Sequence, residues 1–229
     1  MTGYILLEGG AEFGGQMAEP DQRALTLAGG STARISIIPT AAAPDNNHQR
    51  AGGNGQRWFG SLGATQVAVV PLIDAASAAN PAIGEALRNS RLIYLLGGFP
   101  HYLGETLKDS LAWAAALEAY QQGAVLAGSS AGAMVLCDYY FNPSGGDIVD
   151  GLGLVSNACV LPHHNAFGRD WAPRLTELLP EAVLIGIDER TGMLNDGPDG
   201  AWTVYGQGTV TLYRGEVVEI HQAGQRLSL

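Results

Sequence analysis

Short apolar runs that alternate with longer segments of helical spacing constrain the fold of this chain more than any other feature. The runs lie at residues 4–7, 35–38, 67–70, 92–96 and 124–127. Each run is continuously apolar, which is typical of strands covered on both faces. Helical spacing occupies the segments between them, at 21–27, 49–62, 81–89 and 103–121. This alternation predicts a doubly wound α/β fold with a mostly parallel sheet and helices on both faces.

The remaining part of the chain is expected to complete the same domain. Residues 139–150 are rich in aromatic, Asn, Pro and Gly residues, which indicates a surface excursion. Residues 171–179 predict a helix and 182–187 a strand, and the runs at 202–205 and 209–212 predict antiparallel edge strands. No linker or internal repeat divides the chain, so we expect one domain over residues 1–229.

Charge and composition exclude several classes of function. The net charge is −10, from twelve basic and twenty-two acidic residues, and no cationic stripe is present to bind nucleic acid. The apolar runs are too short to cross a membrane, and the first residues lack a basic leader, so we expect a cytoplasmic protein. Cys137 and Cys159 lie in apolar stretches without metal-ligand spacing, which predicts buried thiols and neither a metal nor another cofactor. The sequence allows a homodimer.

The segment Gly128–Gly132 has the pattern of a nucleophile turn. It follows the run at 124–127 and precedes a helix-like stretch at 133–137, so Ser130 lies on a sharp strand-to-helix turn. The amide of Ala131 and the positive end of the following helix would lie where an oxyanion develops. Small residues here could also serve close packing of a helix on a sheet, but the strand before and the helix after favour a catalytic serine. Ser129 is a competing hydroxyl with only one glycine at the required spacing.

Six ordered segments together resemble the serine peptidases that include aspartyl dipeptidase (peptidase E) and cyanophycinase. These segments are Gly9-Gly10, Ile37-Ile38-Pro39-Thr40-Ala41, Leu95-Leu96-Gly97-Gly98, Gly128-Ser129-Ser130-Ala131-Gly132-Ala133, Leu161-Pro162-His163-His164 and Ile185-Gly186-Ile187-Asp188-Glu189-Arg190-Thr191. The resemblance implies a fold like that of class I glutamine amidotransferases, with serine in place of their cysteine.

The resemblance also implies partners for Ser130. It assigns the general base to His163. The neighbouring His164 is the alternative base, and otherwise a packing or pocket residue in contact with substrate. Glu189 follows a buried strand and would orient His163, as in the cyanophycinase branch. The dipeptidase branch uses an aspartate instead, for which Asp147 or Asp138 would be the counterpart.

Other residues are candidates for transition-state and substrate contacts. Gly98 ends the fourth strand, and with Ala131 it would supply a two-donor oxyanion hole. His101 and Tyr102 stand in the segment Phe99-Pro100-His101-Tyr102, where the family usually carries polar residues that help to hold substrate, and they would line a pocket of different chemistry. Arg169 and Arg174, like Arg190, could bind a substrate carboxylate, or they could form ordinary surface ion pairs.

The sequence therefore predicts a serine peptidase that cleaves short peptides, a dipeptidase or exopeptidase, through a Ser-His-Glu triad and an acyl-enzyme. An amidotransferase-like binding protein without hydrolysis, and an esterase or amidase acting on small molecules, are the alternatives. A nucleotide-binding module has little support, because no Gly-x-x-x-x-Gly-Lys segment is present.

Overall fold

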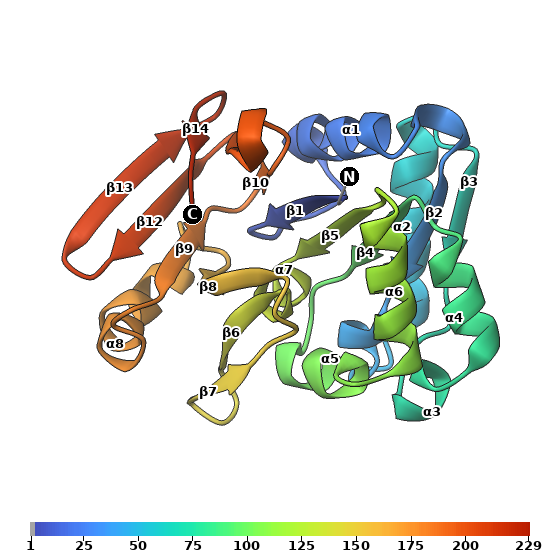
Figure 1. The fold of residues 1–229 in the computed structure, drawn as a ribbon, viewed down its shortest axis with the longest axis horizontal. Helices are drawn as coiled ribbons and strands as arrows, with labels where there is room; N and C mark the ends of the chain where they lie inside the picture. Colours follow the sequence, from blue (N-terminus) through green and yellow to red (C-terminus); the bar gives the residue numbers. More distant parts are fainter. Residues whose placement is uncertain (1–2) are drawn as a thin grey trace.

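The computed structural model describes residues 3–229, and the described strands form two sheets (Figure 1). The larger sheet has the order β14-β11-β10-β1-β5-β4-β2-β3, and the smaller has the order β13-β12-β9-β8-β6-β7. The larger sheet contains β1 (Tyr4–Glu8), β2 (Arg34–Ile38), β3 (Gln66–Val69), β4 (Leu92–Leu95), β5 (Val125–Ser129), β10 (Thr191–Leu194), β11 (Trp202–Gly206) and β14 (Arg226–Leu227). The smaller contains β6 (Cys137–Asn142), β7 (Asp147–Asp150), β8 (Val155–Leu161), β9 (Val183–Ile187), β12 (Thr209–Arg214) and β13 (Val217–Gln222).

The central strands of both sheets are parallel. β1, β5, β4, β2 and β3 run in one direction in the larger sheet, and β6, β8 and β9 do so in the smaller. Antiparallel strands from the last part of the chain extend both sheets at their edges. The predicted α/β fold class, with a mostly parallel centre and antiparallel edges, is confirmed, although the strands divide into two sheets where one was expected.

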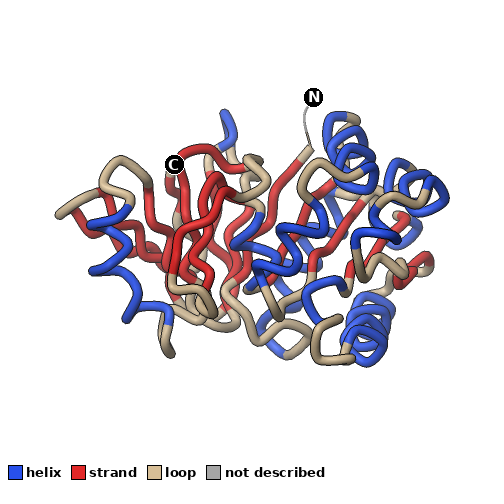
Figure 2. Tube along the Cα trace, turned by 90° about the horizontal axis from the view of Figure 1, so that it is seen from below, coloured by secondary structure: helices blue, strands red, loops and turns tan. Residues whose placement is uncertain are grey.

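Helices cover both faces of the larger sheet, as Figure 2 shows. On one face, α1 (Ala18–Leu27) and α2 (His48–Ser61) contribute Leu25 and Phe59 to a core that also contains Ile37. On the other face, α4 (Pro81–Arg88) and α6 (Leu111–Gln121) pack against the strands. Burial on both sides explains why these strands are continuously apolar in the sequence.

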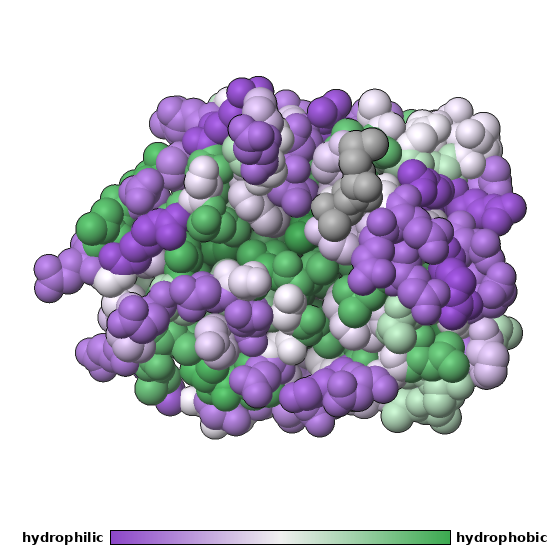
Figure 3. Space-filling model, in the orientation of Figure 1, coloured by the Kyte–Doolittle hydropathy of each residue, from purple (hydrophilic) through white to green (hydrophobic). Residues whose placement is uncertain are grey.

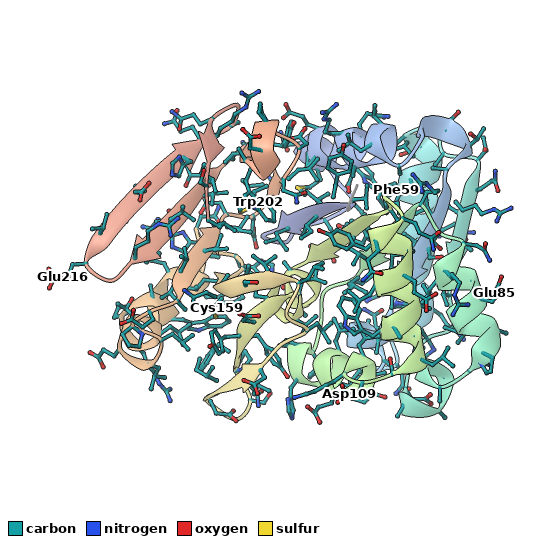
Figure 4. All side chains as sticks on the ribbon, viewed as in Figure 1. Phe59, Glu85, Asp109, Cys159, Trp202 and Glu216 are labelled. Carbon is teal, nitrogen blue, oxygen red and sulfur yellow. The ribbon has the colours of Figure 1, made fainter. Side chains whose placement is uncertain are left out.

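The segment expected as one helix over residues 103–121 is two helices. α5 (Pro100–Leu107) ends before Asp109, whose φ of 56° lies in the left-handed region, and α6 begins after it. Ser110 caps α6, because its Oγ accepts a hydrogen bond from the Trp113 amide at 3.0 Å. Figure 4 labels Asp109 near the junction of the two helices. The short α3 (Ala75–Ala78) lies earlier in the chain.

The predicted surface excursion at 139–150 is instead an antiparallel hairpin of β6 and β7. Tyr140 on β6 is fully buried, and Phe141 is 7% exposed. The Gly and Pro residues belong to the turn, where Gly146 has a φ of 72°, and the aromatic residues before it belong to the core. The loop-like composition of residues 139–150 therefore comes from two different parts of the hairpin, the buried strand residues and the turn.

The short helix α7 (Ala131–Val135) joins β5 of the larger sheet to β6 of the smaller. Its apolar residues share one core with β8, and α8 (Ala172–Leu178) packs near β9 and β12. Figure 3 shows apolar residues in the middle of one face, over this junction, within a mostly hydrophilic surface. None of the helices in the described part of the chain has the length and apolar character that crossing a bilayer requires.

Candidate active site

Ser130 lies at the strand-to-helix turn between β5 and α7, with a φ of 49° and a ψ of −111°. This conformation is strained for a residue with a side chain, and such strain is concentrated at functional sites. The neighbouring backbone leaves room for glycine only: a Cβ at Gly128 would lie 2.4 Å from the Gly132 carbonyl carbon, and a Cβ at Gly132 would lie 2.2 Å from the Leu95 oxygen. The Ser130 amide donates to the Glu8 carbonyl at 2.9 Å, which ties the turn to β1.

His163 connects Ser130 to Glu189. Its Nε2 lies 3.1 Å from Ser130 Oγ, and its Nδ1 lies 2.8 Å from Glu189 Oε1. These are the two contacts that a general base needs, one to the hydroxyl and one to an orienting carboxylate. The His163 amide donates to the Gly9 carbonyl at 2.7 Å, and the His163 ring stacks on Phe167 with centroids 5.0 Å apart. Backbone and ring are therefore both fixed.

Asp138 and Asp147, the alternative orienting carboxylates, hydrogen bond elsewhere. Asp138 Oδ2 accepts from the Asn157 amide at 2.6 Å, and Asp147 Oδ1 accepts from Asn142 Nδ2 at 3.1 Å. Both contacts stabilise the strands and turn of the smaller sheet, and Glu189 is the carboxylate that the structure brings to His163.

His164 faces the interior, and its ring is 1% exposed. Its Nε2 lies 2.8 Å from the Tyr213 hydroxyl, and its Nδ1 lies 3.4 Å from Asp188 Oδ1. Burial lowers the pKa of His164, the Asp188 carboxylate opposes this shift, and Arg169 adds to it. A ring so enclosed has no surface left for a ligand. The expected contact of His164 with substrate is therefore wrong, and the structure shows the packing role instead.

The Gly97-Gly98 turn lies beside the nucleophile. A Cβ at Gly97 would be 3.3 Å from Ser130 Cβ. Gly98 has a φ of 138°, and a Cβ there would lie 2.2 Å from the Ala41 carbonyl oxygen. The amide of Ala131 opens α7 on the other side of Ser130. Gly98 and Ala131 therefore bracket the serine.

His101 and Tyr102, both in the first turn of α5, are held by hydrogen bonds to the surrounding protein. His101 Nδ1 lies 3.1 Å from the Tyr140 hydroxyl, and the Tyr102 hydroxyl donates to the Ile73 carbonyl at 2.9 Å. Both rings are exposed, and neither lines the cavity beside Ser130 described below.

The arginines expected near the substrate are also outside that cavity. Arg174 Nη2 donates to the Gly146 carbonyl at 2.5 Å, and its guanidinium lies 5.8 Å from the centre of the Phe141 ring. Arg169 is exposed, and its charge acts on the buried His164 and the half-buried Tyr213. Arg190 lies with Glu189 at a separate depression of about 370 Å³.

A cavity of about 750 Å³ opens beside Gly97 and Gly98. Its walls come from the loop after β1, the segment after β2, α2 and the end of β4. They comprise Glu12, Phe13, Ala41, Ala42, Asp45, Asn47, Arg50, Ala51, Asn54, Arg57, Trp58, Ser61, Leu96, Gly97, Gly98 and Phe99. Three of these wall residues, Glu12, Arg50 and Arg57, are not among the site residues predicted from the sequence. The available signal was their place after the first two strands, since ligands of open α/β sheets bind outside the carboxyl ends of strands.

A buried acidic pair, Glu8 and Asp21, lies behind the nucleophile turn, and neither residue has accessible surface. The Tyr94 hydroxyl donates to Glu8 Oε2, and Trp58 Nε1 donates to Asp21 Oδ2 at 2.7 Å. Burial, with the nearby Glu12 carboxylate adding to it, raises the pKa of Asp21 to about 7. Burial and the Asp21 charge hold the pKa of Glu8 well above its usual range. Both carboxyl groups therefore keep their protons to a higher pH than an exposed carboxyl group does.

No group of three or more His, Cys, Asp or Glu side chains in residues 3–229 is arranged to hold a metal ion.

Comparisons with known proteins identify the family of this chain. The model of peptidase family S51 matches residues 5–199. A cyanophycinase of Geminocystis herdmanii (strain PCC 6308) is 30% identical over 240 residues, which cover 96% of this chain and 84% of the relative.

Two solved structures share the fold. A peptidase from an acI-B1 actinobacterium is 31% identical, with a TM-score of 0.88 over 100% of this chain and 98% of its own. A candidate peptidase E protein of Listeria monocytogenes EGD-e, at 20% identity, has a TM-score of 0.62 with both chains fully covered, and it supports the fold alone. The resemblance expected from the sequence is confirmed: the chain belongs to peptidase family S51 and is a serine-type peptidase.

Proposed function

We propose that this serine peptidase cleaves short peptides, as a dipeptidase or exopeptidase, through a triad of Ser130, His163 and Glu189. The observation that carries the proposal is the continuous hydrogen-bonded array of the three side chains, with 3.1 Å between hydroxyl and imidazole and 2.8 Å between imidazole and carboxylate.

In this mechanism, Ser130 Oγ attacks the scissile carbonyl carbon while His163 Nε2 takes its proton. Glu189 accepts a hydrogen bond from Nδ1–H and stabilises the imidazolium that forms. The amides of Gly98 and Ala131 donate to the oxyanion. His163 then protonates the leaving amine, an acyl-enzyme remains on Ser130, and a water activated by His163 releases the acid.

The cavity favours short substrates. A volume of about 750 Å³ holds a few residues, and it is walled by protein on several sides. The relative from Geminocystis is called a cyanophycinase, but in this chain Phe99-Pro100-His101-Tyr102 follows the two glycines where the family resemblance leads one to expect polar side chains. We therefore propose short peptides as the substrate class. The buried free thiols of Cys137 and Cys159 fit a reducing compartment, and we propose the cytoplasm.

The test is turnover of a dipeptide and tripeptide library by wild type and by Ser130→Ala. Removing the hydroxyl deletes the nucleophile without opening a core cavity, so the variant should fold and lose at least about 10⁴-fold in kcat. Ser144→Ala, an exposed change on the β6–β7 turn, is the matched control and should leave turnover unchanged. Hydrolysis of activated esters without hydrolysis of any peptide would favour a small-molecule esterase. Failure of Ser130 to react with a serine-directed phosphonate would favour a binding protein.

A further inference from the structure

Glu12 lies in a loop whose backbone is held in an unusual conformation. The residues on either side, Ala11 and Phe13, have φ values of 57° and 65°, and each costs free energy because neither is glycine. Three aromatic rings fix the Phe13 ring, with centroids 5.4 to 6.5 Å away: Trp58, Phe59 and Tyr94. The loop therefore presents the Glu12 carboxylate to the cavity in a defined position.

The carboxylate of Glu12 and the nucleophile flank the same glycine. Glu12 Oε2 accepts a hydrogen bond from Ser129 Oγ at 2.9 Å. Its other oxygen, Oε1, lies 3.4 Å from the point where a Cβ on Gly97 would stand, and that point is 3.3 Å from Ser130 Cβ. One oxygen is therefore anchored and the other faces the space next to Ser130.

No cation neutralises Glu12 among the described residues. The ion pairs of residues 3–229 use other carboxylates. The two arginines of the cavity bond to amides instead: Arg50 Nε donates to Asn47 at 2.9 Å, and Arg57 Nη2 donates to Asn54 at 2.6 Å. Within residues 3–229 the Glu12 carboxylate thus faces Gly97 and Ser130 without a cationic partner.

An unpaired carboxylate there opposes catalysis unless the substrate brings a cation. Negative charge develops on the carbonyl oxygen in the transition state, and a like charge nearby disfavours it. The cation must lie close to the scissile carbonyl, because Glu12 does. The α-ammonium group of an amino-terminal residue is two bonds from the carbonyl carbon, whereas the charge of a lysine or arginine side chain is several bonds further away.

We propose that Glu12 is a specificity-determining residue that binds the α-ammonium group of the substrate. The enzyme would then cleave after the first residue of peptides with a free amino terminus. This inference rests on the proposed function, and it names the peptide end at which the same site acts.

The experiment compares leucine release from twenty Xaa-Leu dipeptides and from their N-acetylated forms. Wild type should cleave the best free dipeptide with a kcat/KM at least about 100-fold above that of its N-acetylated form, the factor expected when one member of a close charge pair is removed. For free dipeptides, kcat/KM should also fall above about pH 8 as the α-amino group loses its proton.

Glu12→Gln keeps the size of the side chain and an acceptor for Ser129. It should lower kcat/KM for the free dipeptide about 100-fold and leave it unchanged or higher for the acetylated form, because the opposing charge is gone, so the preference disappears. Glu85→Gln, on the outer side of α4 where Figure 4 labels it, is the control that preserves the preference.

Equal cleavage of free and acetylated dipeptides by wild type would overturn the role of Glu12 while leaving the peptidase function intact, and this comparison needs no variant. A Glu12→Gln enzyme that loses both activities equally would show a structural role and would also overturn the proposal. Cleavage of neither set by a wild-type enzyme that reacts with a phosphonate would overturn both the short-peptide function and this inference.

Discussion

The buried pair of Glu8 and Asp21 makes stability depend on pH in a specific direction. In the unfolded chain Asp21 titrates near 3.8, whereas in the folded protein its pKa is about 7. The folded state therefore binds more protons than the unfolded state between these values, and the free energy of unfolding falls as pH rises. The stabilising contribution of the protonated Asp21 is fully present below about pH 4 and is lost as pH rises to about 7, above which the Asp21 contribution levels off.

The size of this loss in the free energy of unfolding follows from the pKa shift of Asp21. Three pKa units correspond to about 4 kcal/mol, and more than half of this loss falls between pH 5 and pH 8.5. Glu8 contributes in the same direction, because burial and the Asp21 charge raise its pKa. The groups that face the pair are Tyr94, Trp58 and the Glu12 carboxylate, and the last adds to the effect.

The informative variant is Asp21→Asn. Its side-chain oxygen can still accept from Trp58, and its amide can donate to Glu8, so the site stays hydrogen bonded but loses one titration. Urea unfolding should show a wild-type midpoint that falls by about 1 M or more between pH 5 and pH 8.5, and a clearly smaller fall in the variant. Equal pH dependence of the two proteins, or a wild-type midpoint that rises over this range, would refute the raised pKa of Asp21.

Three further predictions concern the site. Glu189→Gln should lower kcat about a thousandfold or more while Asp147→Asn leaves it unchanged in single-substrate kinetics, and the opposite ranking would assign the orienting role to the aspartate. His164→Ala should lower the free energy of unfolding by about 2 to 4 kcal/mol in urea titration, because it leaves a cavity and unpaired buried polar atoms; a change below about 0.5 kcal/mol would contradict its buried packing. Gly98→Ala should lose stability and most turnover, since its methyl group would meet the Ala41 oxygen at 2.2 Å; a fully active variant would show that the turn relaxes freely.

The strands of the larger sheet could be predicted because burial on both faces leaves a local signal. The runs that begin at Tyr4, Ile35, Val67, Leu92 and Ala124 became β1 to β5 within one or two residues. The break between α5 and α6 left no such signal, since Lys108-Asp109-Ser110 is compatible with a helix and nothing local announces the left-handed φ of Asp109. The second sheet was also missed, because which strands pair across a long separation is decided by tertiary contacts.

The site divides in the same way. The sequence placed Ser130, His163 and Glu189 in motifs at strand ends, and the structure brings them within hydrogen-bonding distance of one another. The cavity beside these residues was not predicted from the sequence. Its charged residues, Glu12 and Arg57 among them, lie in a loop and on an ordinary helix face, and tertiary contacts such as the Ser129 hydrogen bond of Glu12 bring them to the cavity beside Gly97 and Gly98.

The division of the strands into two sheets bears on how a peptidase is kept harmless during its own synthesis. Ser130 follows a strand of the larger sheet, whereas His163 follows β8 of the smaller, and Glu189 lies where the chain passes from β9 to β10 and so returns from one sheet to the other. A chain that has completed only the first 150 residues already contains the proposed nucleophile, but it contains neither the proposed base nor the proposed orienting acid. The proposed triad is therefore complete only when both sheets have formed and packed together, and we expect a growing chain to be inactive as a peptidase until then.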